Sequence, residues 1–340
     1  MKRGSEVGQA DAGGAAVARE IEAIWTWHVI NKKTGEINRH ADGQPGCDFA
    51  MTGGEILYAF AFLHAKTNDA KWLDRAKLIA NYYWDRRNKK TNLIPNRPNA
   101  GKDRFDGSHF DTSIAGLHCR SLLEAYRLTN DPTFRDHALA YLKAYAHLGY
   151  DPAAKKFWGS LKLDGTPVSG PRVTGGYGQY EPRGHVDLWQ PYIAGYEHAL
   201  YAAQTYAFAY QLTKEPAMLE AAEKWADWIQ RDWPPTKCNE NTWYAPYAKH
   251  DAPHGTYAGH YGRTISFALH MHALTKNSRY LDFAKSAANQ AIAKLHYKGL
   301  LRGHPAKPYY EAADGVGYLL VALLQLDHAQ TASPLPYENW

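Results

Sequence analysis

The chain has few cysteines, and they follow no recognisable pattern. Its 340 residues include three, Cys47, Cys119 and Cys238, and no two of them are spaced as Cys-x-x-Cys. An odd number without that spacing argues against a disulfide framework and against a zinc ribbon. The sequence also lacks a His-Glu-x-x-His string and an acidic calcium loop. We therefore expect no protein-bound metal.

Long apolar runs are missing as well. No stretch reaches the roughly 18 apolar residues that would cross a bilayer, so we expect no membrane-spanning segment. The segment from Met1 to Ala16 is small, polar and glycine-rich, and it lacks the apolar centre of a signal peptide. We favour a secreted or periplasmic protein from which a signal peptide has been removed, while a cytoplasmic location stays open.

Strong charge of one sign is absent too. The formal net charge is +5 and the pI about 8.8, yet no run of five or more basic residues occurs. Nucleic-acid binding needs a clustered basic patch, so we expect no nucleic-acid partner. Mild positive charge suits an acidic polysaccharide or oligosaccharide. The glycine strings at 175–178 and 314–317 lack the preceding strand and the spacing of a nucleotide loop, so no cofactor is expected.

Aromatic residues and histidines are abundant by contrast, with 24 Tyr, 11 Trp and 17 His. Tyrosine and tryptophan offer flat apolar faces with a polar edge, which stack on sugar rings or on bases. Packing in the core would account for about half of them. The remainder predicts a groove that binds a sugar.

A ten-residue junction occurs four times, beginning at Thr67, Thr129, Thr213 and Thr275. Each junction follows an apolar helix and precedes an amphipathic one, which indicates a repeated helical hairpin. The apolar helices belong inside the fold and the amphipathic ones outside. The predicted inner helices are 53–66, 112–128, 191–212, 263–274 and 310–327, and the predicted outer helices are 16–29, 70–85, 132–148, 216–232 and 279–295.

This alternation predicts an all-α fold, an α/α toroid that is an incomplete or closed barrel of about five to six helical hairpins. We expect a disordered tail at 1–15 and a single catalytic domain at 16–340. Long loops, which run from outer to inner helices, should open on one rim, and a small hairpin is expected near 162–165. Loops on a rigid scaffold commonly carry function.

The leading candidate for an active site is the segment from His254 to Arg263, which reads His-Gly-Thr-Tyr-Ala-Gly-His-Tyr-Gly-Arg. Histidine and tyrosine carry protons, arginine binds anions, and glycine allows the backbone to approach a ligand. The alternative is a glycine-rich turn that caps a helix. The predicted third loop supplies a partner segment, 175–192, which is rich in Tyr, His and Trp.

The helical repeat and the His- and Tyr-rich loops resemble the α/α-toroid carbohydrate-active enzymes, and among them the polysaccharide lyases that cleave uronic-acid polymers such as alginate or glucuronan. The resemblance covers nearly the whole chain in architecture and rests on no signature string. It implies β-elimination, in which a base removes the C5 proton, the enolate-like charge is stabilised and the departing O4 is protonated. The catalytic residues that it implies are Tyr257 or Tyr261 with His185 or His260, and Arg263 and Glu181 at the substrate carboxylate.

A second group of residues is expected to bind the substrate around this centre. A tyrosine acts as a base only if its pKa falls well below 10, and a neighbouring arginine would lower it. Asp111 or Thr112 also makes a good helix N-cap, which is the structural alternative for Asp111. The expected substrate-binding residues are His109, Asp111, Tyr177, Tyr180, Trp189, Tyr192, His254 and Tyr309.

Three other functions stay open. A glycoside hydrolase on the same toroid would need two facing carboxylates, and its candidates are Asp111, Glu181, Asp187 and Asp251. A sugar epimerase would use a pair of histidines. A non-catalytic glycan-binding protein would only stack sugars on its rim. His118 and His198 fall within predicted inner helices, and we expect them to be core histidines. His270 and His272 are two residues apart on a predicted helix, so they face different directions and are expected to be packing or surface residues.

Overall fold

The computed structural model describes residues 16, 29–37, 50–96, 109–171, 182–189, 198–234, 255–307, 309–310 and 314–328. Inner and outer helices alternate along this part of the chain, as the sequence predicts. The inner helices are α2 (Ala50–Thr67), α4 (Cys119–Thr129) with the π-helix η2 (Ile114–His118) before it, α6 (Ala199–Thr213), α8 (Ala258–Thr275) and α10 (Val316–His328). The outer helices are α3 (Ala70–Arg86), α5 (Pro132–Leu148), α7 (Pro216–Arg231) and α9 (Ser278–Leu295).

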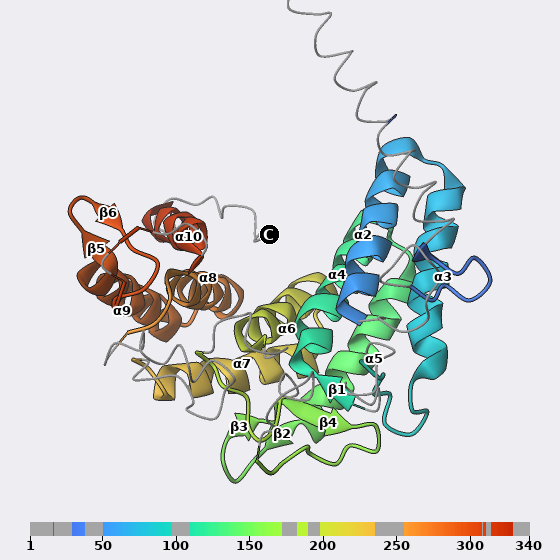
Figure 1. Cartoon of the computed structure of the whole chain (residues 1–340), viewed down its shortest axis with the longest axis horizontal. Helices are drawn as coiled ribbons and strands as arrows, with labels where there is room; N and C mark the ends of the chain where they lie inside the picture. The colour runs from blue at the N-terminus through green and yellow to red at the C-terminus, as the bar shows by residue number, and fades with distance from the viewer. Residues whose placement is uncertain are drawn as a thin grey trace, which may run out of the picture.

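The inner helices contact one another in chain order, from α2 through α4, α6 and α8 to α10. Figure 1 shows them as an arc, with α2 and α3 at one end and α8, α9 and α10 at the other. Each outer helix packs against the inner helix that precedes it. The predicted all-α toroid is confirmed. The predicted bounds of the four outer helices agree with the structure to within one residue, whereas α8 begins five residues before its predicted start.

The repeated junction has a repeated geometry. Each threonine hydroxyl donates to the carbonyl four residues earlier at 2.7 Å, which closes the inner helix. The next residue turns the chain with a positive φ, and the residue after that is the N-cap of the outer helix. At the first junction these residues are Asn68, with a φ of 53°, and Asp69, whose side chain accepts from Lys71 N. The Thr-Asn-Asp string therefore encodes the turn directly.

A second repeat, which the sequence patterns did not reveal, follows the outer helices. Short antiparallel pairs stand after α5 (β2 Tyr150–Asp151 with β3 Lys156–Phe157) and after α9 (β5 His296–Tyr297 with β6 Leu300–Leu301). A single bridge between Ile30 and Ile37 has the same form. The turn after α3 closes similarly, with Asn88 N donating to Leu93 O at 2.9 Å. These hairpins lead the chain from the outer layer back to the inner one.

One further strand pair joins two of the long loops. Strand β1 (His109–Asp111) pairs with β4 (Ser160–Lys162) in an antiparallel register that sets Asp111 opposite Ser160. The expected hairpin near 162–165 is present, because Lys162 N donates to Thr166 O and Gly165 N donates to Lys162 O. This pair fixes the backbone that leads into η2.

The described residues form two core clusters of buried side chains. The larger one fills the space among α2 to α7 and includes Phe267 and Met271 of α8 and Tyr280 of α9. The smaller one lies among α8, α9 and α10. Trp233 and Phe283 pack against both clusters. Many aromatic residues belong to the larger cluster, where Phe157 stacks on Trp225 with ring centroids 4.2 Å apart. Packing therefore uses a large share of the aromatic residues, as expected.

Candidate functional site

The sequence-predicted site residues fall into two groups. Nine of them lie in the described part of the chain, namely Tyr257, Tyr261, His185, His260, Arg263, His109, Asp111, Trp189 and Tyr309. The other five, Glu181, Tyr177, Tyr180, Tyr192 and His254, lie outside the described residues. Asp251, a candidate for the hydrolase interpretation, lies outside them as well.

The leading segment is mostly helix rather than loop. Tyr257 is the N-cap residue of α8 in extended conformation, and the helix starts at Ala258. His260, Tyr261 and Arg263 therefore occupy its first two turns. Successive residues of an α-helix are about 100° apart, so His260 and Arg263, three residues apart, share a face, while Tyr261 points elsewhere.

The three glycines of the segment allow close packing within the protein, and not the approach to a ligand that we expected. A Cβ on Gly262 would lie 2.6 Å from Leu319 N of α10. A Cβ on Gly255 would lie 2.6 Å from the Pro305 side chain, and one on Gly259 would lie 3.3 Å from the carbonyl oxygen of Asp314. Helices α8 and α10 therefore come together backbone to backbone, which holds the first turns of α8 in place.

Arg263 is the centre of the described site. Its guanidinium lies between two tyrosine rings, 3.6 Å from the centroid of Tyr201 on α6 and 4.2 Å from that of Tyr318 on α10. It donates to the Tyr201 hydroxyl and, at 3.3 Å, to Gln204 Oε1. Arg263 is 5% exposed, and no described carboxylate pairs with it. A buried cation without an anion is costly, so this position suits an anionic group of a ligand.

Neutral polar groups surround this cation. Burial, with a contribution from Arg263, lowers the pKa of His198 to about 4, so its imidazole is uncharged at neutral pH. The His198 ring meets Tyr201 edge to face, with centroids 5.4 Å apart. Burial raises the pKa of Tyr201, and the nearby Arg263 opposes that shift. Among the described residues, the surroundings of Arg263 therefore combine its positive charge with groups that donate and accept hydrogen bonds.

A second cluster stands at the start of α8. The Tyr257 ring lies 4.5 Å from that of His304 and 5.9 Å from that of His260. The Thr256 hydroxyl holds His260 Nδ1 at 2.8 Å, which fixes the orientation of its ring. Lys307, 5.8 Å from the Tyr257 ring centroid, makes a buried ion pair of 2.5 Å with Asp314. Tyr257 and His260 are thus neighbours, as a proton-transfer pair requires.

Tyr261 differs from Tyr257 in ways that bear on catalysis. Its side chain is fully buried against Trp233, with ring centroids 5.5 Å apart, and belongs to the α8–α10 cluster. Burial raises its pKa to about 12, opposite to the shift that a tyrosine base needs. Of the two predicted tyrosines, Tyr257 is therefore the better candidate.

His185 and Trp189 belong to one described segment, 182–189, and have different surroundings. His185 Nε2 is 2.9 Å from Asp151 Oδ2, and its ring stacks on Trp158 at 4.0 Å. It is thus attached to the β2–β3 hairpin, and none of its contacts reaches α8. Trp189 does lie beside the site, because its ring is 6.3 Å from that of His260.

Asp111 serves the structural role that was its alternative. Its side chain is 2% exposed and accepts from Asn96 Nδ2 at 2.6 Å, from Ser113 N at 2.9 Å and from Ile114 N at 3.4 Å. Burial raises the pKa of this carboxyl, and the hydrogen bonds oppose the shift. Asp111 therefore caps η2. His109 is half-buried on β1, and Tyr309 is 49% exposed.

Sequence reasoning missed the partners of Arg263. Tyr201, Gln204 and Tyr318 stand in apolar helices, where tyrosine usually signals packing. The repeat holds the signal that would have found Tyr201, because it stands twelve residues before Thr213, just as Arg263 stands twelve before Thr275. Equivalent positions of neighbouring repeats lie at the same level of the toroid.

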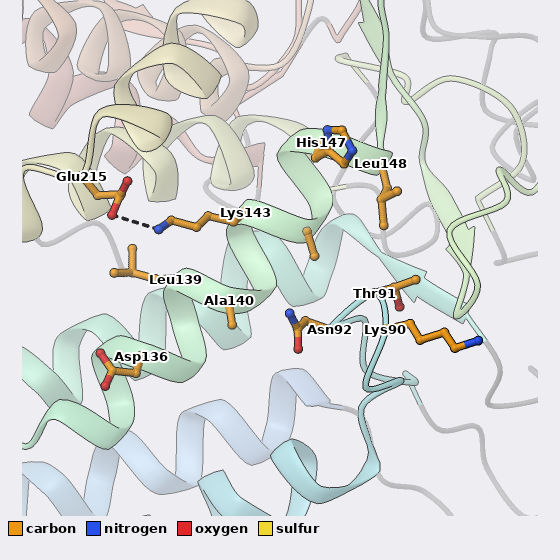
Figure 2. A pocket seen from close by; sticks show the side chains of 11 residues that line it. Lys90, Thr91, Asn92, Asp136, Leu139, Ala140, Lys143, His147, Leu148 and Glu215 are labelled. Atoms are coloured by element: carbon orange, nitrogen blue, oxygen red, sulfur yellow. Dashed lines mark ion pairs between the residues drawn. The ribbon is translucent and has the colours of Figure 1, made fainter.

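A groove of about 790 Å³ lies away from these residues, on the outer layer. Figure 2 shows it along α5, with Leu139 and Ala140 on one side, Thr91 and Asn92 from the turn after α3, and the ion pair between Lys143 and Glu215 at one end. Its lining has no aromatic residue and one histidine, the exposed His147. It therefore lacks the chemistry of the inner face.

Across the part of the chain that the structure describes, no three His, Cys, Asp or Glu side chains gather so that they could hold a metal ion. No helix within that part is long and apolar enough to cross a membrane.

Solved structures share this fold at low sequence identity. A D-mannose isomerase matches with a TM-score of 0.59 at 13% identity, over 93% of this chain and 81% of that one. An α-mannanase of glycoside hydrolase family 76 from Bacteroides thetaiotaomicron matches with a TM-score of 0.56 at 15% identity, over 96% of this chain and 82% of that one. An unsaturated glucuronyl hydrolase from a Bacillus species matches with a TM-score of 0.53 at 16% identity, over 82% of this chain and 74% of that one. These similarities establish the fold alone.

No family model matches the sequence. No curated protein matches it either.

Proposed function

We propose that the chain is a carbohydrate-active enzyme, and more narrowly a lyase that cleaves a uronic-acid polymer by β-elimination. The observation that carries the proposal is Arg263, a buried guanidinium held between Tyr201 and Tyr318 without a described carboxylate partner. A uronate carboxylate would supply the missing anion. Tyr201 and Tyr318 are half-buried and would offer ring edges to the sugar.

Each step of the elimination has a candidate group. Arg263 would bind the carboxylate and stabilise the charge that develops when the C5 proton leaves. His260, on the same face of α8, and Tyr257 beside it would exchange protons with the substrate. When C5–H breaks, its electron pair forms the C4=C5 double bond, C4–O4 breaks, and O4 takes up a proton.

Two of the four carboxylates that hydrolysis could use are committed to local structure. Hydrolysis normally needs two acidic groups on either side of the scissile bond. Of the four candidates, Asp111 is occupied by the cap of η2, and Asp187 Oδ1 accepts from Trp189 N at 3.1 Å within a tight turn. The other two, Glu181 and Asp251, lie outside the described residues.

A sugar epimerase is the second candidate, and a specific observation supports it. Two imidazoles lie near Arg263, that of His198 at the N-cap of α6 and that of His260 on α8, and burial lowers the pKa of His198 so that it is neutral at neutral pH. A neutral histidine can remove a proton beside a carbonyl, and a second one can return it to the other face. Solved structures of a sugar epimerase from a ruminal bacterium and of the D-mannose isomerase share the fold.

The test is incubation with alginate, glucuronan and pectate while the absorbance of the new C4=C5 bond is recorded. We expect the absorbance to rise with at least one of them. Arg263→Met should lower kcat/KM by about 10- to 100-fold, because it removes one or two charge-assisted hydrogen bonds to the substrate. Arg135→Met removes an exposed arginine of α5 and is the matched control. No absorbance change on any uronate, with isomerised product from free sugars, would replace the lyase by the epimerase.

A further inference from the structure

Helix α2 carries a carboxylate that sequence reasoning passed over. Glu55 is the only acidic residue of this helix, whose other residues are largely apolar. An acidic side chain is unusual in an inner helix, where the neighbouring residues Ile56 and Leu57 are buried in the core. Glu55 itself is exposed, and no described residue makes an ion pair or a hydrogen bond with it.

Two neighbouring glycines show which way Glu55 points. A Cβ on Gly53 would collide with the Tyr83 ring of the outer helix α3, and one on Gly54 would lie 3.0 Å from His118 Cα at the start of α4. Each step along an α-helix turns by about 100°. Glu55 follows Gly53 by two residues, so its side chain is rotated by about 200°, or about 160° measured the other way, from the direction of α3. It therefore points toward the inner side of the arc.

The repeat sets the level of Glu55 along the helices. It stands twelve residues before Thr67, as Tyr201 stands before Thr213 and Arg263 before Thr275. The three threonines close their helices with the same hydrogen bond, so the repeats are in register. Tyr201 and Arg263 touch each other. Glu55 thus belongs to the same layer as the Arg263 site, contributed by a different part of the arc.

The surroundings of Glu55 favour its protonated form. Desolvation raises the pKa of this carboxyl, and no cation opposes the shift. Tyr83 of α3 and His118 of η2 are the titratable groups that face this turn of α2 from the elements packed against it, and burial keeps His118 neutral by lowering its pKa to about 4. A carboxyl whose pKa is raised holds its proton to a higher pH than an ordinary glutamate and can act as a general acid.

We propose that Glu55 is a further catalytic residue of the Arg263 site and donates the proton that the departing oxygen takes up. This inference rests on the proposed function. As C4–O4 breaks, the O–H proton of Glu55 passes to O4, the C–O electron pair stays on O4, and the carboxylate that remains is reprotonated by water. Arg263 would hold the substrate carboxylate while Glu55 approaches from α2.

The test compares Glu55→Gln with Glu55→Asp, and Asp74→Asn serves as the control. Asp74 is an exposed carboxylate on the outer helix α3, so the control makes the same acid-to-amide replacement away from the site. We expect Glu55→Gln to lower kcat by about 10²- to 10⁴-fold with a smaller change in KM, and to remove the alkaline limb of the kcat–pH profile. Glu55→Asp should keep that limb with reduced kcat.

A substrate with a nitrophenolate leaving group adds a readout that a structural role would not change. Nitrophenolate departs without a proton, so it should restore turnover in Glu55→Gln to near that of the wild type. Equal kcat for wild type and Glu55→Gln on the polymer overturns the assignment and leaves the proposed function standing. Loss of activity that nitrophenolate does not restore overturns it as well.

A readout independent of turnover separates the two proposals. The Glu55 carboxyl carbon, identified by its absence in Glu55→Gln, is observed by ¹³C NMR while a mannuronate trisaccharide is added. A shift in its titration midpoint supports Glu55 as part of the ligand site even if the wild type has no lyase activity. Binding of the trisaccharide without that shift overturns the assignment, and neither binding nor turnover overturns both proposals.

Discussion

Asp111 shows how a single carboxylate can be fully committed to structure. Its oxygens satisfy backbone N–H groups at the start of η2, the side chain of Asn96 and, at 2.5 Å, the hydroxyl of Ser113. A buried carboxylate is tolerated only when it is hydrogen-bonded in this way. Its contribution is therefore to stability, and its removal should affect folding before it affects binding.

We expect Asp111→Ala to lower the free energy of unfolding by about 2–3 kcal/mol, because it removes an N-cap and leaves buried donors unpaired. Urea unfolding followed by circular dichroism measures the loss. Asp69→Ala is the matched control, since Asp69 caps α3 through Lys71 N at an exposed position and should cost about 1 kcal/mol. Equal losses for the two variants would contradict the buried network.

The hydroxyl of Tyr261 offers the opposite case. No hydrogen bond of good geometry reaches it, and its polar neighbour is the backbone of Thr256, although the ring is fully buried. Removing an unpaired buried hydroxyl costs little, and Tyr261→Phe should leave the melting temperature unchanged or slightly raised. Differential scanning calorimetry tests this expectation. A fall of several degrees would mean that the contact between the hydroxyl and the Thr256 backbone stabilises the fold.

At the scale of elements, α8 and α10 depend on each other through glycine. The close approach at Gly262 leaves no room for a side chain, because a Cβ would also lie 2.6 Å from the carbonyl carbon of Tyr318. Tyr318 in turn forms one side of the Arg263 site. Packing between these two helices therefore sets the distance between Arg263 and one of its aromatic neighbours.

We expect Gly262→Ala to destabilise the protein by about 1–3 kcal/mol, because backbone atoms of α10 must move. Gly317→Ala is a matched control within α10, since a Cβ there meets nothing within 4 Å. The control should stabilise the helix by about 0.5–1 kcal/mol. Thermal unfolding of both variants measures the difference. Similar melting temperatures would mean that α10 adapts to the added methyl group.

The helices were predictable from the sequence because their signals are local. A threonine, a residue that tolerates positive φ and an N-cap recur within three positions, so the helix ends at Thr67 and Thr213 could be placed closely. The start of α8 was wrong because its glycines looked like a loop. Their helical role depends on α10, more than fifty residues later, and no local pattern contains that information.

The site was less predictable for the same physical reason. Arg263 and the pair of Tyr257 and His260 were identified because their side chains are chemically distinctive. Tyr201 could not be told from the tyrosines of the core, since its role comes from a contact with another helix. The sequence does show Glu55 as a single acidic residue in an apolar helix. The register of the repeat then predicts its level along the inner helices.

At the scale of the whole molecule, buried histidines set the response to acid. Burial lowers the pKa of His118, His137 and His198 to about 4 and that of His270 to about 3. The unfolded chain protonates these imidazoles near pH 6.5, whereas the folded protein does not. Unfolding therefore takes up protons below pH 6.5, and stability that is present above this pH is lost as the pH falls toward 4.

We expect the melting temperature to fall steeply between about pH 6.5 and 4, with each histidine contributing up to roughly 1.4 kcal/mol per pH unit. Thermal unfolding in buffers from pH 8 to 4 measures this slope. His118→Gln should reduce the slope by about one proton, because it removes one titrating group. A melting temperature that stays constant down to pH 4.5 would contradict the neutral burial of these residues.

The order of contacts along the arc also bears on how the chain folds. Each inner helix meets the inner helices just before and after it, and each outer helix meets its own hairpin partner. Most native contacts thus join segments that are close in sequence, which corresponds to a low contact order and favours fast folding. Hairpins of this kind can form one after another as the polypeptide leaves the ribosome, and each one can pack against the hairpin that formed before it.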